Sequence, residues 1–313
     1  MTTEELIAAR RAEPWREALR KSKKNKERTD IPRVEMNELD AEYRSHTRLE
    51  EVNLGLTKEQ AMQEAQRCLD CPNPTCMQGC PVSINIPTFV KNIERGEFLE
   101  AARVLKETSA LPAVCGRVCP QEKQCESKCI HLKMGKPAVA IGYLERFAAD
   151  YERESGNISI PEVAEKNNIK VAVIGSGPAG LSFAGDMAKQ GYDVTVFEAL
   201  HEIGGVLKYG IPEFRLPNKI VDVEIDNLSK MGVKFMKDCI VGKTISVEDL
   251  EAEDFKGIFV ASGAGLPNFM NIPGEYSINI MSSNEYLTRV NLMDAASEDS
   301  LSAQHAAWEQ NAQ

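Results

Sequence analysis

The stretch IKVAVIGSGPAGLSFAGDMAKQGYDVTVFEAL, residues 169–200, decides the fold of the second half of this chain. The apolar run 171–174 predicts a strand, which leads into the glycine-rich turn Gly175-x-Gly177-x-x-Gly180. A helix and a second strand that ends at Glu198 are expected to follow. This order is typical of a β-α-β unit that binds a dinucleotide, so the sequence predicts a Rossmann-like α/β domain here.

Each residue of this fingerprint has a physical reason to lie near a dinucleotide. Gly175 permits the tight turn, Gly177 lets the backbone approach a pyrophosphate, and Gly180 allows the helix to pack closely on the strand. The N-terminus of the helix offers free N–H groups to the phosphates. Glu198 is placed to accept hydrogen bonds from a ribose 2′-hydroxyl and repels a 2′-phosphate, which favours FAD or NAD over NADP. Because all these parts are present, a purely structural glycine turn is the weaker interpretation.

Upstream of this domain the cysteines are concentrated, since eight of the nine lie between Cys68 and Cys129. Their spacing defines two groups, C-x2-C-x4-C-x3-C-P and C-x3-C-P-x4-C-x3-C, made by Cys68, Cys71, Cys76 and Cys80 and by Cys115, Cys119, Cys125 and Cys129. In two-cluster ferredoxins the cysteine before the proline binds the other cluster. Cys80, which precedes Pro81, is therefore expected to serve a different cluster from Cys68, Cys71 and Cys76.

Structural zinc is the alternative interpretation, because four thiolates also suit zinc. Zinc sites usually pair two separated C-x2-C knuckles, and only Cys68 with Cys71 has that spacing. The spacing therefore favours iron–sulfur clusters. The remaining cysteine, Cys239, is expected to be a buried and inert thiol.

Composition limits the functions that need to be considered. The chain has 313 residues and a formal net charge of -10, which argues against general nucleic-acid binding. There is no apolar stretch of 18 residues and no hydrophobic signal core at the N-terminus, so we expect a cytoplasmic protein without membrane contact. A reducing compartment disfavours disulfides, which agrees with cysteines that bind metal.

The expected domains follow from changes in composition along the chain. Residues 1–55 form a polar arm with a basic run from Arg16 to Arg28, which we interpret as a solvated, partly helical arm rather than a docking surface for an acidic partner. The fold class is then a helical iron–sulfur domain followed by an incomplete Rossmann-like FAD-binding domain. The expected bounds are 56–155 for the cluster domain, 156–168 for a linker, 169–290 for the FAD-binding domain and 291–313 for an atypical tail.

The chain resembles the small subunit of NADPH-dependent glutamate synthase in five segments: CLDCPNPTCMQGCPVSINIPTFV, CGRVCPQEKQCESKC, VAVIGSGPAGL, GGVLKYGIPEFRLP and VASGAGLPNFMNIPGE. The same module resembles the N-terminal part of dihydropyrimidine dehydrogenase and the large subunit of ferredoxin:NADP oxidoreductases. The resemblance covers most of residues 40–290.

The resemblance implies two [4Fe-4S] clusters and one FAD. The ligands that it implies are Cys68, Cys71, Cys76 and Cys129 for one cluster, and Cys80, Cys119, Cys125 and Glu145 for the other. Cys115 is then a bystander. The flavin-binding residues that it implies are Gly175, Gly177, Pro178, Ala179, Gly180, Glu198, Gly205, Val206 and Arg215.

The function implied by the resemblance is electron input. NADPH would reduce FAD, and the clusters would pass electrons to the glutamate synthase large subunit or an equivalent FMN-containing partner, which forms glutamate from glutamine and 2-oxoglutarate. The alternatives are a ferredoxin:NADP or sulfide-type oxidoreductase subunit, and a non-catalytic fragment that carries clusters. Family members continue into a second glycine fingerprint for NADPH. This sequence has none, so we expect a truncated or alternatively terminated chain that is inactive alone.

Overall fold

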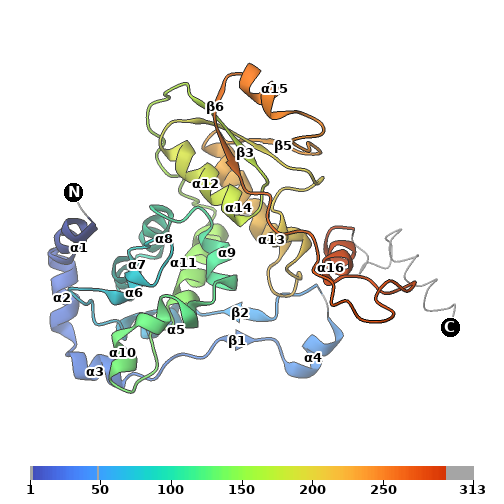
Figure 1. The fold of residues 1–313 in the computed structure, drawn as a ribbon. Coiled ribbons are helices and arrows are strands. Elements are labelled where there is room, and N and C mark those ends of the chain that lie inside the picture. The colour runs from blue at the N-terminus through green and yellow to red at the C-terminus, as the bar shows by residue number, and fades with distance from the viewer. Residues whose placement is uncertain (1–2, 48, 294–313) are drawn as a thin grey trace. The chain divides into compact units, whose positions relative to one another are not determined.

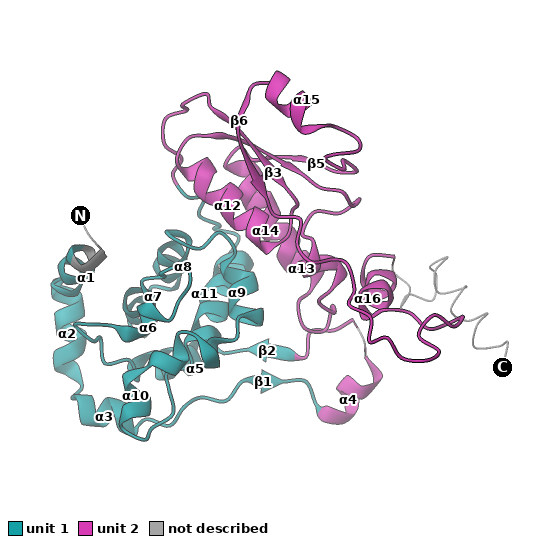
Figure 2. Cartoon of the chain, viewed as in Figure 1, with its two compact units in different colours: residues 1–40, 53–161 teal, residues 41–52, 162–313 magenta. Residues whose placement is uncertain are grey.

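The computed structural model describes residues 3–47 and 49–293, and it divides the chain into two compact units (Figure 2). Unit 1 comprises residues 1–40 and 53–161, and unit 2 comprises residues 41–52 and 162–313. Unit 1 is mainly helical and carries every cysteine except Cys239, whereas unit 2 contains a parallel sheet. The expected fold class, a helical domain followed by a Rossmann-like α/β domain, is confirmed. Most of the predicted tail, residues 294–313, lies outside the described residues.

Helices make up most of unit 1 (Figure 1). They are α1 (Thr3–Arg11), α2 (Pro14–Ser22), α3 (Asn25–Asp30), α5 (Lys58–Gln66), α6 (Thr75–Gln78), α7 (Ile86–Glu94), α8 (Phe98–Lys106), α9 (Pro112–Val118), α10 (Ile130–Lys133) and α11 (Ile141–Ser155), with 3₁₀ turns at Gln121–Lys123 and Glu126–Lys128. A short antiparallel pairing joins β1 (Asn37–Glu38) to β2 (Asn53–Gly55). Residues 157–169 form neither helix nor strand.

Local sequence explains where these helices begin and end. Thr57 caps α5, because its hydroxyl accepts a hydrogen bond from the Gln60 N–H and the Gln60 side chain accepts one from the Thr57 N–H. Gly96 lies between α7 and α8 with a φ of 85°, a left-handed conformation that glycine adopts without strain. Gly156 ends α11 in the same region, with a φ of 73°.

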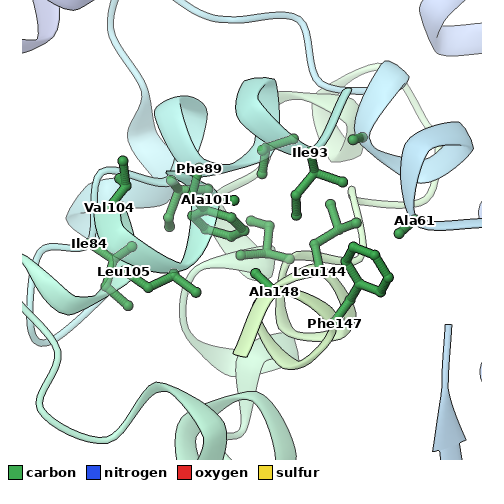
Figure 3. Packing of buried hydrophobic residues seen from close by; sticks show 14 of the residues in the cluster. Ala61, Ile84, Phe89, Ile93, Ala101, Val104, Leu105, Leu144, Phe147 and Ala148 are labelled. Carbon is green, nitrogen blue, oxygen red and sulfur yellow. The ribbon is translucent and has the colours of Figure 1, made fainter. Parts of the chain in front are cut away.

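The apolar core of unit 1 lies between α5, α7, α8 and α11 (Figure 3). Phe89 and Ile93 of α7 and Leu144 of α11 are fully buried. Phe98 packs edge-to-face on Phe147, with 5.0 Å between the ring centroids. This packing fixes α7 and α11, the two helices that carry Lys91 and Glu145 beside the cysteine loops.

Two helices of unit 1 cross closely because one of them carries a glycine at the crossing. A Cβ atom on Gly116 of α9 would lie 2.5 Å from the backbone nitrogen of Arg146 of α11. One turn earlier in α11, a Cβ atom on Gly142 would lie 2.3 Å from the Gln121 side chain. The close approach therefore places Cys115 and Glu145, the neighbours of Gly116 and Arg146, at the crossing.

Unit 2 is built on one parallel sheet with the strand order β5-β4-β3-β6. Its strands are β3 (Lys170–Ile174), β4 (Asp193–Phe197), β5 (Lys234–Met236) and β6 (Phe255–Val260), and its helices are α4 (Ala41–His46), α12 (Pro178–Lys189), α13 (Val206–Tyr209), α14 (Asn218–Lys230), α15 (Val247–Ala252) and α16 (Ser283–Asn291). The central strand β3 is an apolar run, and α12 and α14 pack together beside it (Figure 1). Within the described part of the chain, no helix is long and apolar enough to span a bilayer.

We expect Gly116→Ala to destabilise unit 1, since the added Cβ atom forces α9 and α11 apart. Overpacking against backbone costs up to about 3 kcal/mol. That cost outweighs the ~1 kcal/mol that alanine gains over glycine in a helix. The urea midpoint, followed by circular dichroism at the helical band, should therefore fall. Gly265→Ala is the control, because a Cβ atom there meets nothing within 4 Å. Equal midpoints for the two variants would show that the crossing tolerates a side chain.

Candidate functional site

Four of the predicted cluster ligands line one pocket in unit 1. They come from the loop after α5, from α6 and from the start of α10, and they are Cys68, Cys71, Cys76 and Cys129. Apolar side chains, including Ile86, Val90 and Ile141, form much of the remaining wall. The structure therefore brings the first three cysteines of the first group together with the last cysteine of the second group.

The cysteine loops meet through two short contacts. The Thr75 hydroxyl donates a hydrogen bond of 2.6 Å to the Lys128 carbonyl oxygen. A Cβ atom on Gly79 would lie 2.6 Å from the Gln124 carbonyl oxygen, so only glycine fits without a shift at this position. The first loop thus lies directly against the segment 124–128, which leads into Cys129.

Burial and crowding favour the protonated thiols of Cys68, Cys71 and Cys76 when no metal is bound. Burial raises the pKa of Cys71 to about 11, and the neighbouring Cys68 and Cys129 add to this shift. Burial also raises the pKa of Cys68 and, more strongly, that of Cys76. Because metal ligands must be thiolates, binding of a metal at this pocket would release protons.

A second group of predicted ligands gathers beside α11. Glu145 is 5% exposed, and its charge contributes to the raised pKa of both Cys80 and Cys125. Burial is the main cause in each case, and it brings the pKa of Cys125 to about 12. Cys119 also acts on Cys80. The structure therefore places Cys80, Cys119, Cys125 and Glu145 within electrostatic reach of one another.

Cys115, the predicted bystander, makes a hydrogen bond that sequence reasoning missed. The two thiols of Cys115 and Cys119 are joined by a hydrogen bond. This hydrogen bond lowers the pKa of Cys119 to about 7 and raises the pKa of Cys115. The Ser109 side chain in turn bonds to Cys115. Because the more acidic Cys119 is the acceptor, Cys115 serves as a donor to a predicted ligand.

The donor atoms suit iron–sulfur clusters. Seven thiols and one carboxylate form the two groups, and thiolates are the ligands that such clusters use. Among residues 3–47 and 49–293, no three or more His, Cys, Asp and Glu side chains lie close enough to hold a single metal ion. The pocket at Cys68, Cys71, Cys76 and Cys129 offers four thiols, the number that one [4Fe-4S] cluster uses.

The glycine-rich turn of unit 2 leaves space where a pyrophosphate is expected. Gly177 caps α12, and a Cβ atom on it would meet nothing within 4 Å. A Cβ atom on Gly180 would instead lie 2.0 Å from the Gly175 carbonyl oxygen, so the turn is tightly packed on its other side. Pro178 and Ala179 are exposed at the start of α12. The turn therefore offers an open helix N-terminus that fits a phosphate group.

Glu198 holds this turn in place after β4. Its carboxylate accepts hydrogen bonds from the Ser176 N–H at 2.8 Å and the Leu200 N–H at 2.9 Å, and it also accepts one from the Ser176 hydroxyl. Gly205, with a φ of 54°, approaches the turn so closely that a Cβ atom would lie 2.8 Å from the Gly177 Cα atom. Glu198 and Gly205 are thus placed beside the open turn.

The last two predicted flavin residues are exposed. Val206 begins α13 beside Gly205 and is 40% exposed. Arg215 is exposed as well, and its N–H donates to the Pro212 carbonyl oxygen at 2.9 Å. In the described part of the chain, no contact ties the Arg215 side chain to the glycine-rich turn. The role of Arg215 stays a prediction.

Comparison with known proteins recovers the same two parts. Residues 44–157 match the family model of dihydropyrimidine dehydrogenase domain II with a 4Fe-4S cluster. Residues 169–303 match that of pyridine nucleotide-disulphide oxidoreductases. The NAD-dependent dihydropyrimidine dehydrogenase subunit PreT of Escherichia coli (strain K12) is 39% identical over 236 residues, which are 74% of this chain and 57% of the relative. The chain belongs to the family of these two-domain subunits.

The glutamate synthase [NADPH] small chain of Azospirillum brasilense is similar over the same region. It is 34% identical over 241 residues, which are 77% of this chain and 50% of the relative. The chain thus spans about half the length of the curated relatives it matches. The resemblance to the glutamate synthase small subunit is confirmed at the level of the family, a group of iron–sulfur and flavin oxidoreductase subunits. Its assignment to glutamate synthase in particular stays a prediction.

We expect Cys119 to be the most reactive thiol of the metal-free chain. Its pKa of about 7 makes it largely thiolate at pH 7.5, whereas Cys71 and Cys125 stay protonated. Labelling by iodoacetamide, located by peptide mass spectrometry, should rise with pH through about 7 at this residue. Cys115→Ala removes the hydrogen bond, raises the pKa of Cys119 and should slow its labelling at pH 7.5 about tenfold. Cys239→Ala should leave the rate unchanged. Equal rates in the Cys115→Ala variant and the wild type would contradict the hydrogen bond.

Two neighbouring glycines should separate flavin binding from stability. Gly177→Ala fills the open space at the turn, so we expect a rise in the FAD dissociation constant of about tenfold or more. Its free energy of unfolding should change by only about 0.5 kcal/mol. Gly180→Ala overpacks the turn and should lower stability by up to about 3 kcal/mol. Fluorescence titration with FAD and urea unfolding give the two quantities. Unimpaired FAD binding by Gly177→Ala would place the pyrophosphate elsewhere.

Proposed function

We propose that this chain is the electron-input part of a two-component oxidoreductase, which takes electrons from a nicotinamide dinucleotide through FAD and passes them through two [4Fe-4S] clusters to a partner protein. The exchange of ligands between the two cysteine groups carries this proposal. Cys129 lies with Cys68, Cys71 and Cys76, while Cys80 lies near Cys119 and Cys125. Two clusters held in this way share the same loops and are necessarily neighbours, as transfer of single electrons requires.

The residues of unit 2 support a role for FAD at the start of this path. FAD accepts two electrons as a hydride and releases them one at a time. The N-terminus of α12 and the backbone at Gly177 would hold its pyrophosphate, and Glu198 would bind the ribose while it keeps the turn ordered. Gly205 lets the following segment pass close to the turn. This chain therefore contributes binding and orientation to the flavin rather than a catalytic side chain.

We further propose that the electron acceptor is the glutamate synthase large subunit or an equivalent FMN-containing protein. The five matching segments and the 34% identity with the A. brasilense small chain support it. A second candidate acceptor is a partner that acts on dihydropyrimidines, and the 39% identity with PreT supports this one. Reduced chain mixed anaerobically with each partner distinguishes the two, because only the true acceptor is reduced at a rate that saturates with its concentration.

We expect about eight iron and eight acid-labile sulfide per chain after anaerobic purification, without stoichiometric zinc. Metal analysis by mass spectrometry and a colorimetric sulfide assay give these values. Roughly two zinc per chain and no sulfide would refute the proposed function in favour of structural zinc.

Two matched substitutions test the ligand assignment within the same experiment. Cys119→Ser should lose about half of the iron, because it removes a thiolate ligand, whereas Cys115→Ser should retain nearly all of it. Cys115 lies in α9 and Cys119 is the residue that caps its C-terminus, and a hydrogen bond joins the two thiols, so a general loss of structure would affect both variants. Equal iron loss would show that Cys115 is a ligand as well.

A further inference from the structure

The basic run from Arg16 to Arg28 is not the solvated arm that the sequence suggests. Arg16 and Arg28, at its two ends, are each 1% exposed. Helices α2 and α3 therefore direct guanidinium groups into unit 1. Burial of a charge is costly unless an opposite charge compensates it, so the partners of these arginines show what the arm recognises.

The first partner is Asp70, which lies in the loop between Cys68 and Cys71. Asp70 is fully buried and has a φ of 51°, so its backbone is turned into a left-handed conformation. Its carboxylate lies 2.5 Å from Nη2 of Arg16 and 2.6 Å from Nη1 of Arg20. One carboxylate thus receives two guanidinium groups directly beneath the first cysteine loop.

The second partner is Glu94 on α7, which likewise receives two cations. Nη1 of Arg28 lies 2.8 Å from one of its oxygens, and Nζ of Lys91 lies 2.5 Å from the other. The same Lys91 ammonium group donates a hydrogen bond of 2.6 Å to the Cys68 carbonyl oxygen, and Lys91 is fully buried. A buried cation therefore contacts the loop that carries the first ligand.

These contacts leave positive charge in excess beside the first cysteine group. Arg16, Arg20, Arg28 and Lys91, which we call the counter-charge group, pair with two buried carboxylates, Asp70 and Glu94. Arg11 adds a further cation 4.0 Å from Asp70, and the exposed Glu17 lies within electrostatic reach of Arg20. The nearby buried pair of Arg67 and Glu64 is balanced and does not alter this excess. A [4Fe-4S] cluster with four thiolates carries a net charge of about −2 when oxidised and about −3 when reduced, which has the sign needed to compensate.

Buried arginines also lie near the second cysteine group, where Arg117 and Arg146 share the carboxylate of Asp150. This group differs from the first in the contacts that its cysteines make. Its predicted fourth ligand, Glu145, is an anion, as a thiolate is. Glu126, next to Cys125 in the chain, is a further buried carboxylate, and Arg33 pairs with it at 2.8 Å. In the described residues, no lysine or arginine donates a hydrogen bond to the backbone of Cys80, Cys119 or Cys125 as Lys91 does to Cys68.

We propose that the counter-charge group raises the reduction potential of the cluster at Cys68, Cys71, Cys76 and Cys129 above that of the cluster at Cys80, Cys119, Cys125 and Glu145. This inference rests on the proposed function, because it requires both clusters. Reduction adds one negative charge, and nearby cations in a medium of low dielectric constant stabilise the reduced state. The first cluster is then reduced first and holds the electron longer.

The test is a potentiometric titration of the anaerobically purified chain, followed by electron paramagnetic resonance. Lys91→Met removes one cation at nearly constant volume, and Glu94 keeps Arg28 as its partner. We expect the ratio of reduced to oxidised first cluster at a fixed potential to fall about tenfold, a shift of ~59 mV for one electron. The second cluster should change much less.

The matched control is Lys106→Met. Lys106 is also a buried lysine that pairs with a glutamate, Glu152, and donates to a backbone carbonyl, that of Ser159 at 2.8 Å. It differs from Lys91 in making these bonds to a segment that carries no cysteine. In this variant, the ratio of reduced to oxidised cluster at a fixed potential should stay within threefold of the wild-type value for both clusters. Equal shifts in the two lysine variants would overturn the proposal.

A further measurement keeps the proposal testable if Lys91→Met does not fold. Cys119→Ser leaves the first cluster alone, and its potential should match the higher of the two wild-type values. Arg20→Gln, at the partly exposed edge of the counter-charge group, should lower that potential in the same direction by a smaller amount. If the single cluster that remains in Cys119→Ser had the lower of the two wild-type reduction potentials, the proposal would be overturned. Absence of iron and sulfide from the wild type would instead refute the proposed function itself.

Discussion

The contact between the two cysteine loops is the constraint on which the rest of unit 1 depends. The hydrogen bond from Thr75 to the Lys128 carbonyl and the tight approach at Gly79 hold the loops against each other. Because of this contact, Cys129 lines one pocket with Cys68, Cys71 and Cys76, while Cys80 lies within electrostatic reach of Cys119 and Cys125. These are the groupings expected of the predicted ligands. The ligands of each site are therefore distant in sequence, and neither site can form unless both loops are folded.

Loop contact and thiol burial together couple metal binding to the fold. In the metal-free chain the raised pKa of Cys71 and Cys76 keeps these two thiols protonated, and Asp70 and Glu94 balance only part of the positive charge nearby. A cluster bound at the proposed site would replace these protons with metal and would supply negative charge beside Lys91 and the buried arginines. On the proposed function, binding and stability would arise from the same groups, and loss of a cluster would affect the basic arm as well as the loops.

Sequence reasoning succeeds where one local rule determines the outcome. The capping pattern of Thr57 and Gln60 specifies the start of α5. The assignment of Cys80 to a second cluster, which rests on the proline after it, stays a prediction. Sequence reasoning fails where a partner is remote. Arg16 reads as a solvated residue because its carboxylate, Asp70, is 54 positions away and its burial depends on a left-handed turn. The hydrogen bond from Cys115 to Cys119 is missed because the ligand assignment leaves Cys115 without a role.

The cysteine pocket of unit 1 and the glycine-rich turn of unit 2 also differ in their exposure to solvent. This difference agrees with the cofactor proposed for each. The first cysteine pocket has largely apolar walls, which lower the dielectric constant around a redox centre and strengthen the effect of every nearby charge. The glycine-rich turn instead exposes Pro178, Ala179 and the open face of Gly177, which suits a large, charged dinucleotide whose phosphates would bind free backbone N–H groups. On the functions proposed above, charge would tune unit 1 and backbone geometry would select the ligand of unit 2.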